Sequence, residues 1–90
     1  MSAGRYSVVL SPGAKRAIEH DLPEAVAAAV VDLLYGPLVE DPHRVGKPLR
    51  FQLEGYWWAR RGQYRVVCSI HDDEVIVRVV RISHRADVHG

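Results

Sequence analysis

The fold of this chain depends most on one stretch, Ala59-Arg60-Arg61-Gly62-Gln63-Tyr64-Arg65-Val66-Val67. The pair Gly62-Gln63 suits a two-residue hairpin loop with glycine at its first position. Such a loop places Arg60 directly opposite Arg65 in the neighbouring strand. Alternation then gives one apolar face with Trp57, Ala59, Tyr64, Val66, Cys68 and Ile70, and a second face with Tyr56, Trp58, Arg60, Arg65, Val67 and Ser69.

The segments around this hairpin predict two helices and two more strands. Residues 5–10 are rich in strand formers, and Ser11-Pro12 is a typical helix start for a helix over residues 12–21. A second helix is expected over residues 24–35, ended by Gly36-Pro37, followed by a loop over residues 38–48. The hairpin strands themselves are expected over residues 53–61 and 64–70, and the last strand over residues 74–82, with Asp72-Asp73 as the second turn. This β-α-α-β-β-β order predicts one α+β domain over residues 1–90, with a helical hairpin packed on a mostly antiparallel sheet.

Two arginines that face each other across neighbouring strands repel unless an anion lies between them. Arg60 and Arg65 therefore predict an anion-binding surface. The alternative is a solvated face neutralised by carboxylates, which Glu54, Asp72 or Asp87 would supply. The neighbouring Trp58 and Tyr56 suit the stacking of unpaired bases. Trp58 is equally compatible with a filler under the C-terminal segment or a hydrophobic contact for a partner.

The position of the last two strand arginines depends on the second turn. A two-residue turn places Arg78 opposite Val67 on the arginine-bearing face and Arg81 on the helix-facing side. A longer turn over residues 72–74, or a slip by one residue, exchanges the two between faces.

Composition and charge narrow the function classes. The chain is 48% apolar and 26% charged, and it has neither a membrane-length apolar run nor a signal peptide, so a cytoplasmic protein is expected. Residues 1–43 carry three Lys or Arg against six Asp or Glu, whereas residues 44–90 carry nine against five. This asymmetry indicates an anionic partner for the second half. The single Cys68 is expected to be buried, and the histidines lack metal-ligand spacing, so no metal or cofactor is expected.

The C-terminal segment Ser83-His84-Arg85-Ala86-Asp87-Val88-His89 adds groups suited to phosphoryl chemistry. Histidine moves protons near neutral pH, and arginine stabilises negative charge on phosphate oxygens. His84 and His89 are therefore the candidates for proton transfer.

Four blocks together resemble the RelE branch of the RelE/ParE toxin superfamily. They are Val45-Gly46-Lys47-Pro48-Leu49, Leu53-Glu54-Gly55-Tyr56-Trp57, the hairpin stretch quoted first, and Ile82-Ser83-His84-Arg85-Ala86-Asp87-Val88. The resemblance implies the same β-α-α-β-β-β fold. It also implies a ribosome-dependent mRNA endoribonuclease that uses the RNA 2′-hydroxyl as nucleophile, needs no metal, and is neutralised by a RelB- or YefM-like antitoxin in a toxin–antitoxin hetero-oligomer.

The resemblance also assigns roles to individual residues. Arg65 and Arg85 correspond to the arginines that hold the scissile phosphate, Arg60 assists them, and His84 stands where lysine or histidine is common. The residues expected to bind RNA are Trp58, Tyr56, Arg61, Arg78 and Lys47. The chain departs from the family at Tyr56 and Trp58, where some members carry a basic pair, and at His89, where the family has tyrosine.

Two alternatives remain at the level of sequence. The chain is also compatible with a ParE-like DNA gyrase poison that acts by binding, and with a degenerate protein that binds only its antitoxin. An antitoxin would dock over the helical hairpin and the basic sheet face, or add a strand to the edge formed by residues 5–10.

Overall fold

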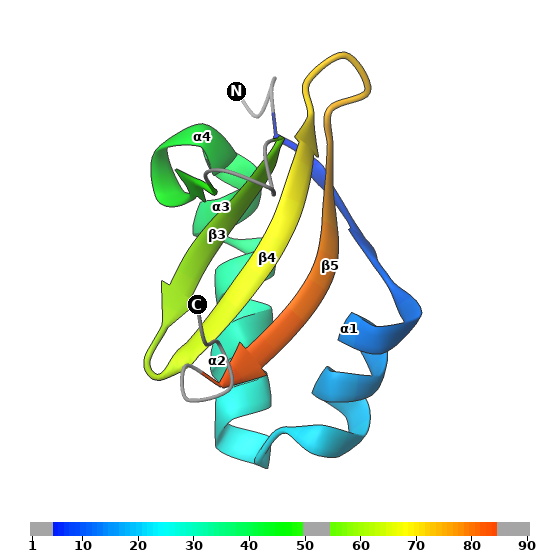
Figure 1. The fold of residues 1–90 in the computed structure, drawn as a ribbon, viewed down its shortest axis with the longest axis vertical. Helices are drawn as coiled ribbons and strands as arrows, with labels where there is room; N and C mark the ends of the chain where they lie inside the picture. Colours follow the sequence, from blue (N-terminus) through cyan, green and yellow to red (C-terminus); the bar gives the residue numbers. More distant parts are fainter. Residues whose placement is uncertain (1–4, 50–54, 85–90) are drawn as a thin grey trace.

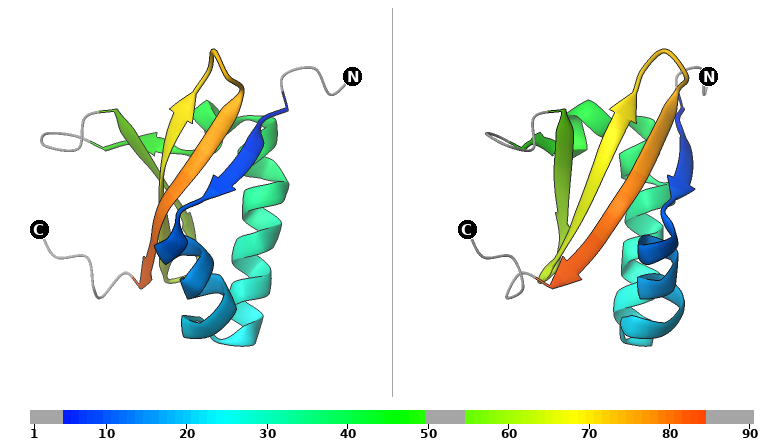
Figure 2. Two further views of the ribbon diagram at one scale, coloured as in Figure 1. Left: turned by 90° about the vertical axis from the view of Figure 1, so that its right-hand side faces the viewer. Right: turned by 45° about the vertical axis from the view of Figure 1, so that its right-hand side comes forward.

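In the described part of the chain, the helices all lie on one side of a five-stranded sheet, which gives two layers and a sheet face that none of these helices covers. The computed structural model describes residues 5–49 and 55–84. Figure 1 looks onto the face without helices, and Figure 2 shows the helical layer behind it. We call this face the open face. The predicted α+β fold is confirmed.

The sheet has the order β1-β5-β4-β3-β2. Its first strand along the chain, β1 (Ser7–Leu10), runs parallel to the last strand, β5 (Ile76–His84), and the other pairs are antiparallel. The remaining strands are β2 (Lys47–Pro48), β3 (Tyr56–Arg61) and β4 (Tyr64–His71). The strand expected to start at residue 53 is observed from Tyr56, and residues 50–54 lie outside the described part.

Both predicted long helical segments are confirmed. Residues 12–21 form α1 (Pro12–Arg16) and a wider π-helical turn, η1 (Ala17–Asp21), whose last bond joins the Leu22 N–H to the Ala17 carbonyl at 2.8 Å. Ser11 caps α1 by accepting a hydrogen bond from the Ala14 N–H at 3.0 Å. The second segment is α2 (Glu24–Tyr35), which has the predicted bounds.

The stretch expected to be a loop over residues 38–48 is more ordered than predicted. It contains two short helices, α3 (Pro37–Glu40) and α4 (Pro42–Val45), and then β2. Each short helix begins with a proline. Proline suits the first helical position because an N–H at that position would have no partner within the helix. At Gly36, which joins α2 to α3, a Cβ would lie 2.8 Å from the Asp32 carbonyl oxygen. Only glycine fits this tight junction.

The predicted two-residue turn between β4 and β5 is wrong. His71 pairs with Ile76, so residues 72–75 form a four-residue turn and β5 starts two residues later than expected. Val75 has a φ of +55°, a left-handed conformation that β-branched residues rarely adopt. The register of β5 changes as a result.

The core lies between the helices and the sheet. Its fully buried side chains include Val30, Leu34, Leu38, Val66, Cys68, Val77 and Val79. Burial raises the pKa of the Cys68 thiol to about 11, so the expectation of a buried cysteine is confirmed. In the part of the chain that the structure describes, none of the helices is long and apolar enough to cross a membrane.

Candidate functional site

The hairpin between β3 and β4 sets the geometry of the open face. Gly62 has a φ of +60°, which glycine adopts without strain, and the loop contains only Gly62 and Gln63. Arg60 therefore pairs with Arg65, as predicted. Ala59, Val66 and Cys68 are buried on the other side, so the predicted division of side chains between the two faces is confirmed there.

Arg65 is held against Trp58. Its guanidinium carbon lies 4.6 Å from the centroid of the Trp58 ring, and its Nε is buried without a hydrogen-bond partner among the described residues. On the neighbouring strand, Lys47 pairs with Trp58 and its Nζ lies 5.7 Å from the same centroid. Trp58 therefore contacts two cations, and the stacking keeps the planar Arg65 fork in a fixed orientation.

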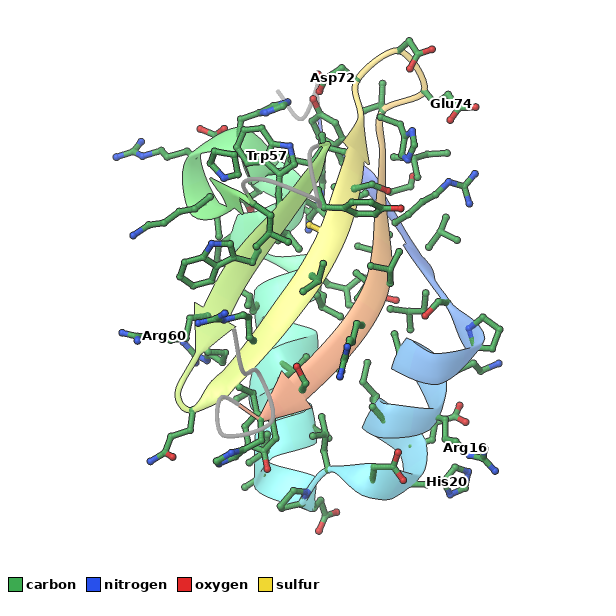
Figure 3. The ribbon with its side chains drawn as sticks, viewed as in Figure 1. Arg16, His20, Trp57, Arg60, Asp72 and Glu74 are labelled. Atoms are coloured by element: carbon green, nitrogen blue, oxygen red, sulfur yellow. The ribbon has the colours of Figure 1, made fainter. Side chains whose placement is uncertain are left out.

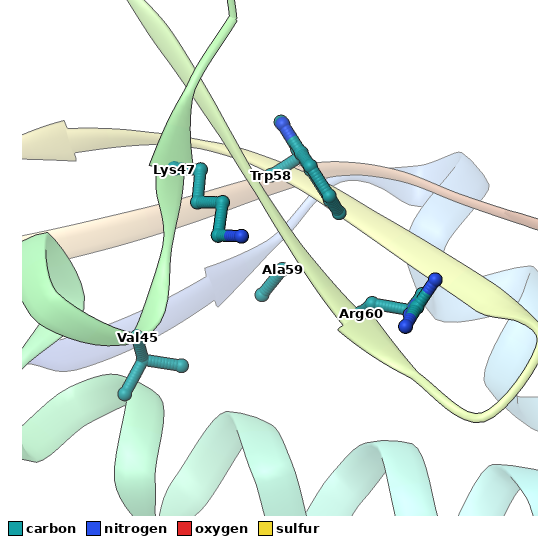
Figure 4. A pocket seen from close by; sticks show the side chains of 5 residues that line it. All are labelled: Val45, Lys47, Trp58, Ala59 and Arg60. Carbon is teal, nitrogen blue, oxygen red and sulfur yellow. The ribbon is translucent and has the colours of Figure 1, made fainter.

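A shallow pocket lies beside this stack. It has a volume of about 300 Å³ and is lined by Val45, Lys47, Trp58, Ala59 and Arg60. Figure 4 shows Lys47, Trp58 and Arg60 around it, with Val45 and Ala59 toward the helical layer. This volume is at the lower end for small-molecule sites. The aromatic ring and cations suit a planar group attached to an anionic backbone.

Both arginines of β5, Arg78 and Arg81, lie on the open face. The pairing shifts between Val67 and Cys68, because Cys68 pairs with Val79 and Val67 with Arg81. The extra residue is a β-bulge. Arg78 has the predicted face but lies opposite Ser69. Arg81 was expected on the helix-facing side. This prediction is wrong, because the bulge turns Arg81 onto the open face, which also carries Arg65.

The arginines of the open face have no acidic partners among the residues that the structure describes. The ion pairs within the described residues involve none of these arginines. They join Arg5 to Glu40, His20 to Glu19 and His43 to Asp72. The carboxylate alternative is thus wrong for Asp72, while Glu54 and Asp87 lie outside the described residues. Cations gathered without counter-charges create a positive potential that attracts anions.

Asp72 lies at the other end of the sheet, in the turn between β4 and β5 (Figure 3). The Tyr6 hydroxyl donates to its Oδ1 at 2.6 Å, and the His43 Nε2 lies 2.8 Å from the same oxygen. Two hydrogen bonds lower the pKa of Asp72, and the one from Tyr6 has a larger effect than the one from His43. The hydrogen bond between Tyr6 and Asp72 also raises the pKa of Tyr6. The His43 ring also packs edge-on against Trp57, with centroids 4.8 Å apart.

The other predicted site residues are divided between the two faces. Tyr56 is exposed on the open face opposite Ser69. Arg61 and His84 both pair with Tyr64 on the helix-facing side, and the His84 and Tyr64 rings meet edge-on at 5.1 Å. Arg85 and His89 lie outside the described residues.

His84 also lines a second pocket of about 350 Å³ at the end of β5. Its other lining residues are Ala17, Asp21, Leu22, Tyr64, Arg81, Ile82 and Ser83. The described His, Cys, Asp and Glu side chains form no group of three placed to hold a metal ion.

A family model described as the ParE toxin of the type II toxin–antitoxin system, parDE, matches residues 8–89. The chain is 47% identical over 81 residues to Toxin RelE of Mycobacterium tuberculosis, covering 90% of this chain and 82% of the relative. It is 44% identical over 84 residues to Toxin RelG of the same organism, covering 93% and 95%.

Solved structures agree with these relatives. The chain superposes with a TM-score of 0.85 and 44% identity on a chain of the toxin–antitoxin complex RelBE2 from Mycobacterium tuberculosis, covering 92% of this chain and 94% of that one. A YoeB/ParE toxin from Agrobacterium tumefaciens shares the fold, with a TM-score of 0.72, 17% identity, and coverage of 87% and 96%. The chain therefore belongs to the RelE/ParE family of type II toxin–antitoxin toxins.

Proposed function

We propose that this chain is a ribosome-dependent mRNA endoribonuclease that inhibits translation in the cytoplasm. One observation carries the proposal: Arg65 is oriented by Trp58 and faces Arg60, without a carboxylate partner in the described part of the chain. A pair of arginines beside an aromatic ring matches the phosphates and bases of single-stranded RNA. The similarity to proteins named Toxin RelE and Toxin RelG supports the same activity.

The proposed reaction is internal transesterification. The RNA 2′-hydroxyl loses its proton and attacks the adjacent phosphorus, and the bond from phosphorus to the next 5′-oxygen breaks as that oxygen takes up a proton. The products are a 2′,3′-cyclic phosphate and a 5′-hydroxyl. Arg65 and Arg85 hold the phosphate, and Arg60 assists them, as negative charge grows on its oxygens. Charge stabilisation of this kind requires no metal.

His84 and His89 are proposed to move the two protons. His84 follows Ser83, the residue opposite Arg65, but its ring lies beside Tyr64 on the helix-facing side. Proton transfer by His84 therefore requires the RNA to pass around the end of the sheet near the β3–β4 hairpin. Tyr56, Trp58, Lys47, Arg61 and Arg78 are proposed to contact the flanking nucleotides.

The proposed protein partner is a RelB- or YefM-like antitoxin, which binds the toxin in a hetero-oligomer. The similar Mycobacterium tuberculosis structure is a toxin–antitoxin complex. Two docking modes fit this fold. The antitoxin covers the helices and the open face, or it adds a strand to the outer edge of β1, which lies at the edge of the sheet.

Cleavage assays with programmed ribosomes test the proposed activity. The purified chain is expected to cut ribosome-bound mRNA in the presence of a chelator and to leave cyclic phosphate ends. Arg65→Ala is expected to cut roughly 10²–10³ times more slowly, whereas Arg16→Ala, which removes an exposed arginine of α1, is expected to cut normally. Growth arrest with intact mRNA on the ribosomes would overturn the proposal.

Expression of the chain in cells separates the alternatives. The ParE description of the matching family model keeps a gyrase poison under consideration. DNA damage with intact mRNA would favour that function. A folded chain that is harmless when expressed without antitoxin would instead indicate a protein that only binds its antitoxin.

A further inference from the structure

The bulge in β5 changes what the open face can bind. Strict alternation along the strand would put Arg78 and Arg81 on opposite faces, because they are three residues apart. In the structure Val79 and Ile82 are buried, whereas Val80 and Arg81 between them are both exposed. Two consecutive outward residues are the expected result of one inserted residue.

Contacts from the start of α1 hold this bulge in place. The Ser11 N–H donates to the Val79 carbonyl at 2.9 Å, and the Ser11 hydroxyl donates to the Val80 carbonyl at 3.0 Å. The carbonyl of the inserted residue is therefore satisfied by a side chain from another element. The orientation of Arg81 is thus supported by the tertiary structure as well as by the strand.

Arg81 lies close to the Arg65–Trp58 stack but is separate from it. Arg81 is opposite Val67, two residues from Arg65 on the same face, so the two arginines are diagonal neighbours. Side chains in this relation start about 7–8 Å apart. The Arg65 guanidinium turns toward Trp58 on β3, which is the direction away from β5. The two arginine heads are therefore held apart.

The surroundings of Arg81 also leave its charge available. Asp21 lines the same pocket of about 350 Å³ as Arg81, yet the two form no ion pair. No other described carboxylate pairs with Arg81 either. An exposed guanidinium on the open face is well placed to bind a phosphate with two parallel hydrogen bonds.

We infer that Arg81 binds a second backbone phosphate of the RNA, next to the phosphate held by Arg60 and Arg65. The inference rests on the proposed RNA-cleaving function and adds a second contact point on β5. The RNA backbone then crosses the open face from the hairpin toward β5, with the bulge setting the spacing between the two phosphate sites.

The test measures the affinity of an uncleavable 2′-O-methyl RNA over a series of salt concentrations. Removing one phosphate contact to a single strand reduces the slope of log affinity against log salt by about 0.7. Arg81→Gln is expected to show this reduction, with binding weaker by about tenfold, while Arg81→Lys is expected to restore the slope. The matched control Arg16→Gln, which removes an exposed arginine of α1, is expected to keep the slope and affinity of the unmodified chain.

Thermal melts check that all variants are folded, and ribosome cleavage is measured in parallel. If the chain cleaves mRNA and needs Arg65, but Arg81→Gln behaves like Arg16→Gln in both assays, the inference fails and the proposed function stands. If the unmodified chain cleaves no mRNA, the proposed function fails, and the salt slope alone decides whether Arg81 binds phosphate. Absence of any RNA binding overturns the inference.

Discussion

The two ends of β4 differ in how their charged residues are partnered. In the turn after β4, the exposed Asp72 carboxylate is bound by Tyr6 and His43, so its charge has partners within the same chain. At the other end of β4, next to the hairpin, Arg65 faces Arg60 of β3 without a described carboxylate partner. The first arrangement ties elements together, whereas the second leaves positive charge for a ligand. Substitutions at the two ends should therefore affect different properties.

The largest expected effect is that of Arg65→Ala on cleavage. Removing one group that stabilises charge in a transition state costs roughly 10²–10³ in rate. Single-turnover cleavage on programmed ribosomes measures this loss. Arg65→Lys keeps the charge but loses the planar fork, so it is expected to recover only part of the rate. Full activity in Arg65→Ala would show that the uncompensated arginines are not the phosphate site.

Arg60→Glu tests the comparison directly. The substitution gives Arg65 a carboxylate partner within the chain, as Asp72 has partners within the chain at the other end of β4. A Glu at this position faces Arg65, and an opposite-charge pair across two strands contributes about 0.2–1 kcal/mol. The variant is expected to unfold at higher denaturant concentration while binding RNA roughly 10- to 100-fold more weakly. Arg60→Ala is the control for the loss of Arg60 alone. Unchanged RNA affinity would contradict the proposed site.

Trp58→Ala is expected to have an intermediate effect. Loss of the ring removes a stacking surface for a base, which is worth about 1–3 kcal/mol, and frees the Arg65 head. RNA binding is expected to weaken about tenfold, and Trp58→Phe is expected to retain most of the affinity. Fluorescence anisotropy with a labelled RNA measures both variants. Equal affinities for all three proteins would show that the ring faces no base.

The smallest effect is expected at the paired end. The pKa of Asp72 is lowered from its ordinary value of 3.8, so its contribution to stability is present above that pH and is lost as the pH falls through the lower folded-state pKa. When the pH is lowered below about 4, the stability of Asp72→Asn is therefore expected to fall less than that of the unmodified chain. Thermal melts over an acidic pH series measure the difference. Parallel pH profiles would contradict the role of Asp72, and cleavage at neutral pH is expected to be unchanged.

The hairpin and its two arginines could be predicted because the turn signal there is strong. Gly62-Gln63 allows one register, and each residue of β3 and β4 then has a fixed face. The division into two long helical segments was equally accessible, since Ser11-Pro12 and Gly36-Pro37 are clear boundary signals. These local signals are independent of the rest of the chain.

The position of Arg81 could not be predicted for two physical reasons. The turn after β4 uses a left-handed Val75, a conformation for which the residue type gives no signal. The bulge lies at Val79-Val80, where both residues are apolar, so the pattern does not reveal which one is turned outward. The Ser11 contact that supports the bulge comes from a residue 69 positions earlier in the chain.

The parallel pairing of β1 with β5 has a consequence for folding kinetics. The first strand pairs with the last, from Ser7 with Ile76 to Leu10 with Val79, so the sheet cannot be completed until almost the whole chain is available. Contacts between distant parts of a sequence slow folding because the intervening chain must be ordered first. We therefore expect the complete sheet to form only after most of the chain has left the ribosome that makes it. For the proposed function, this delay would give the proposed antitoxin time to meet the chain before the sheet is complete.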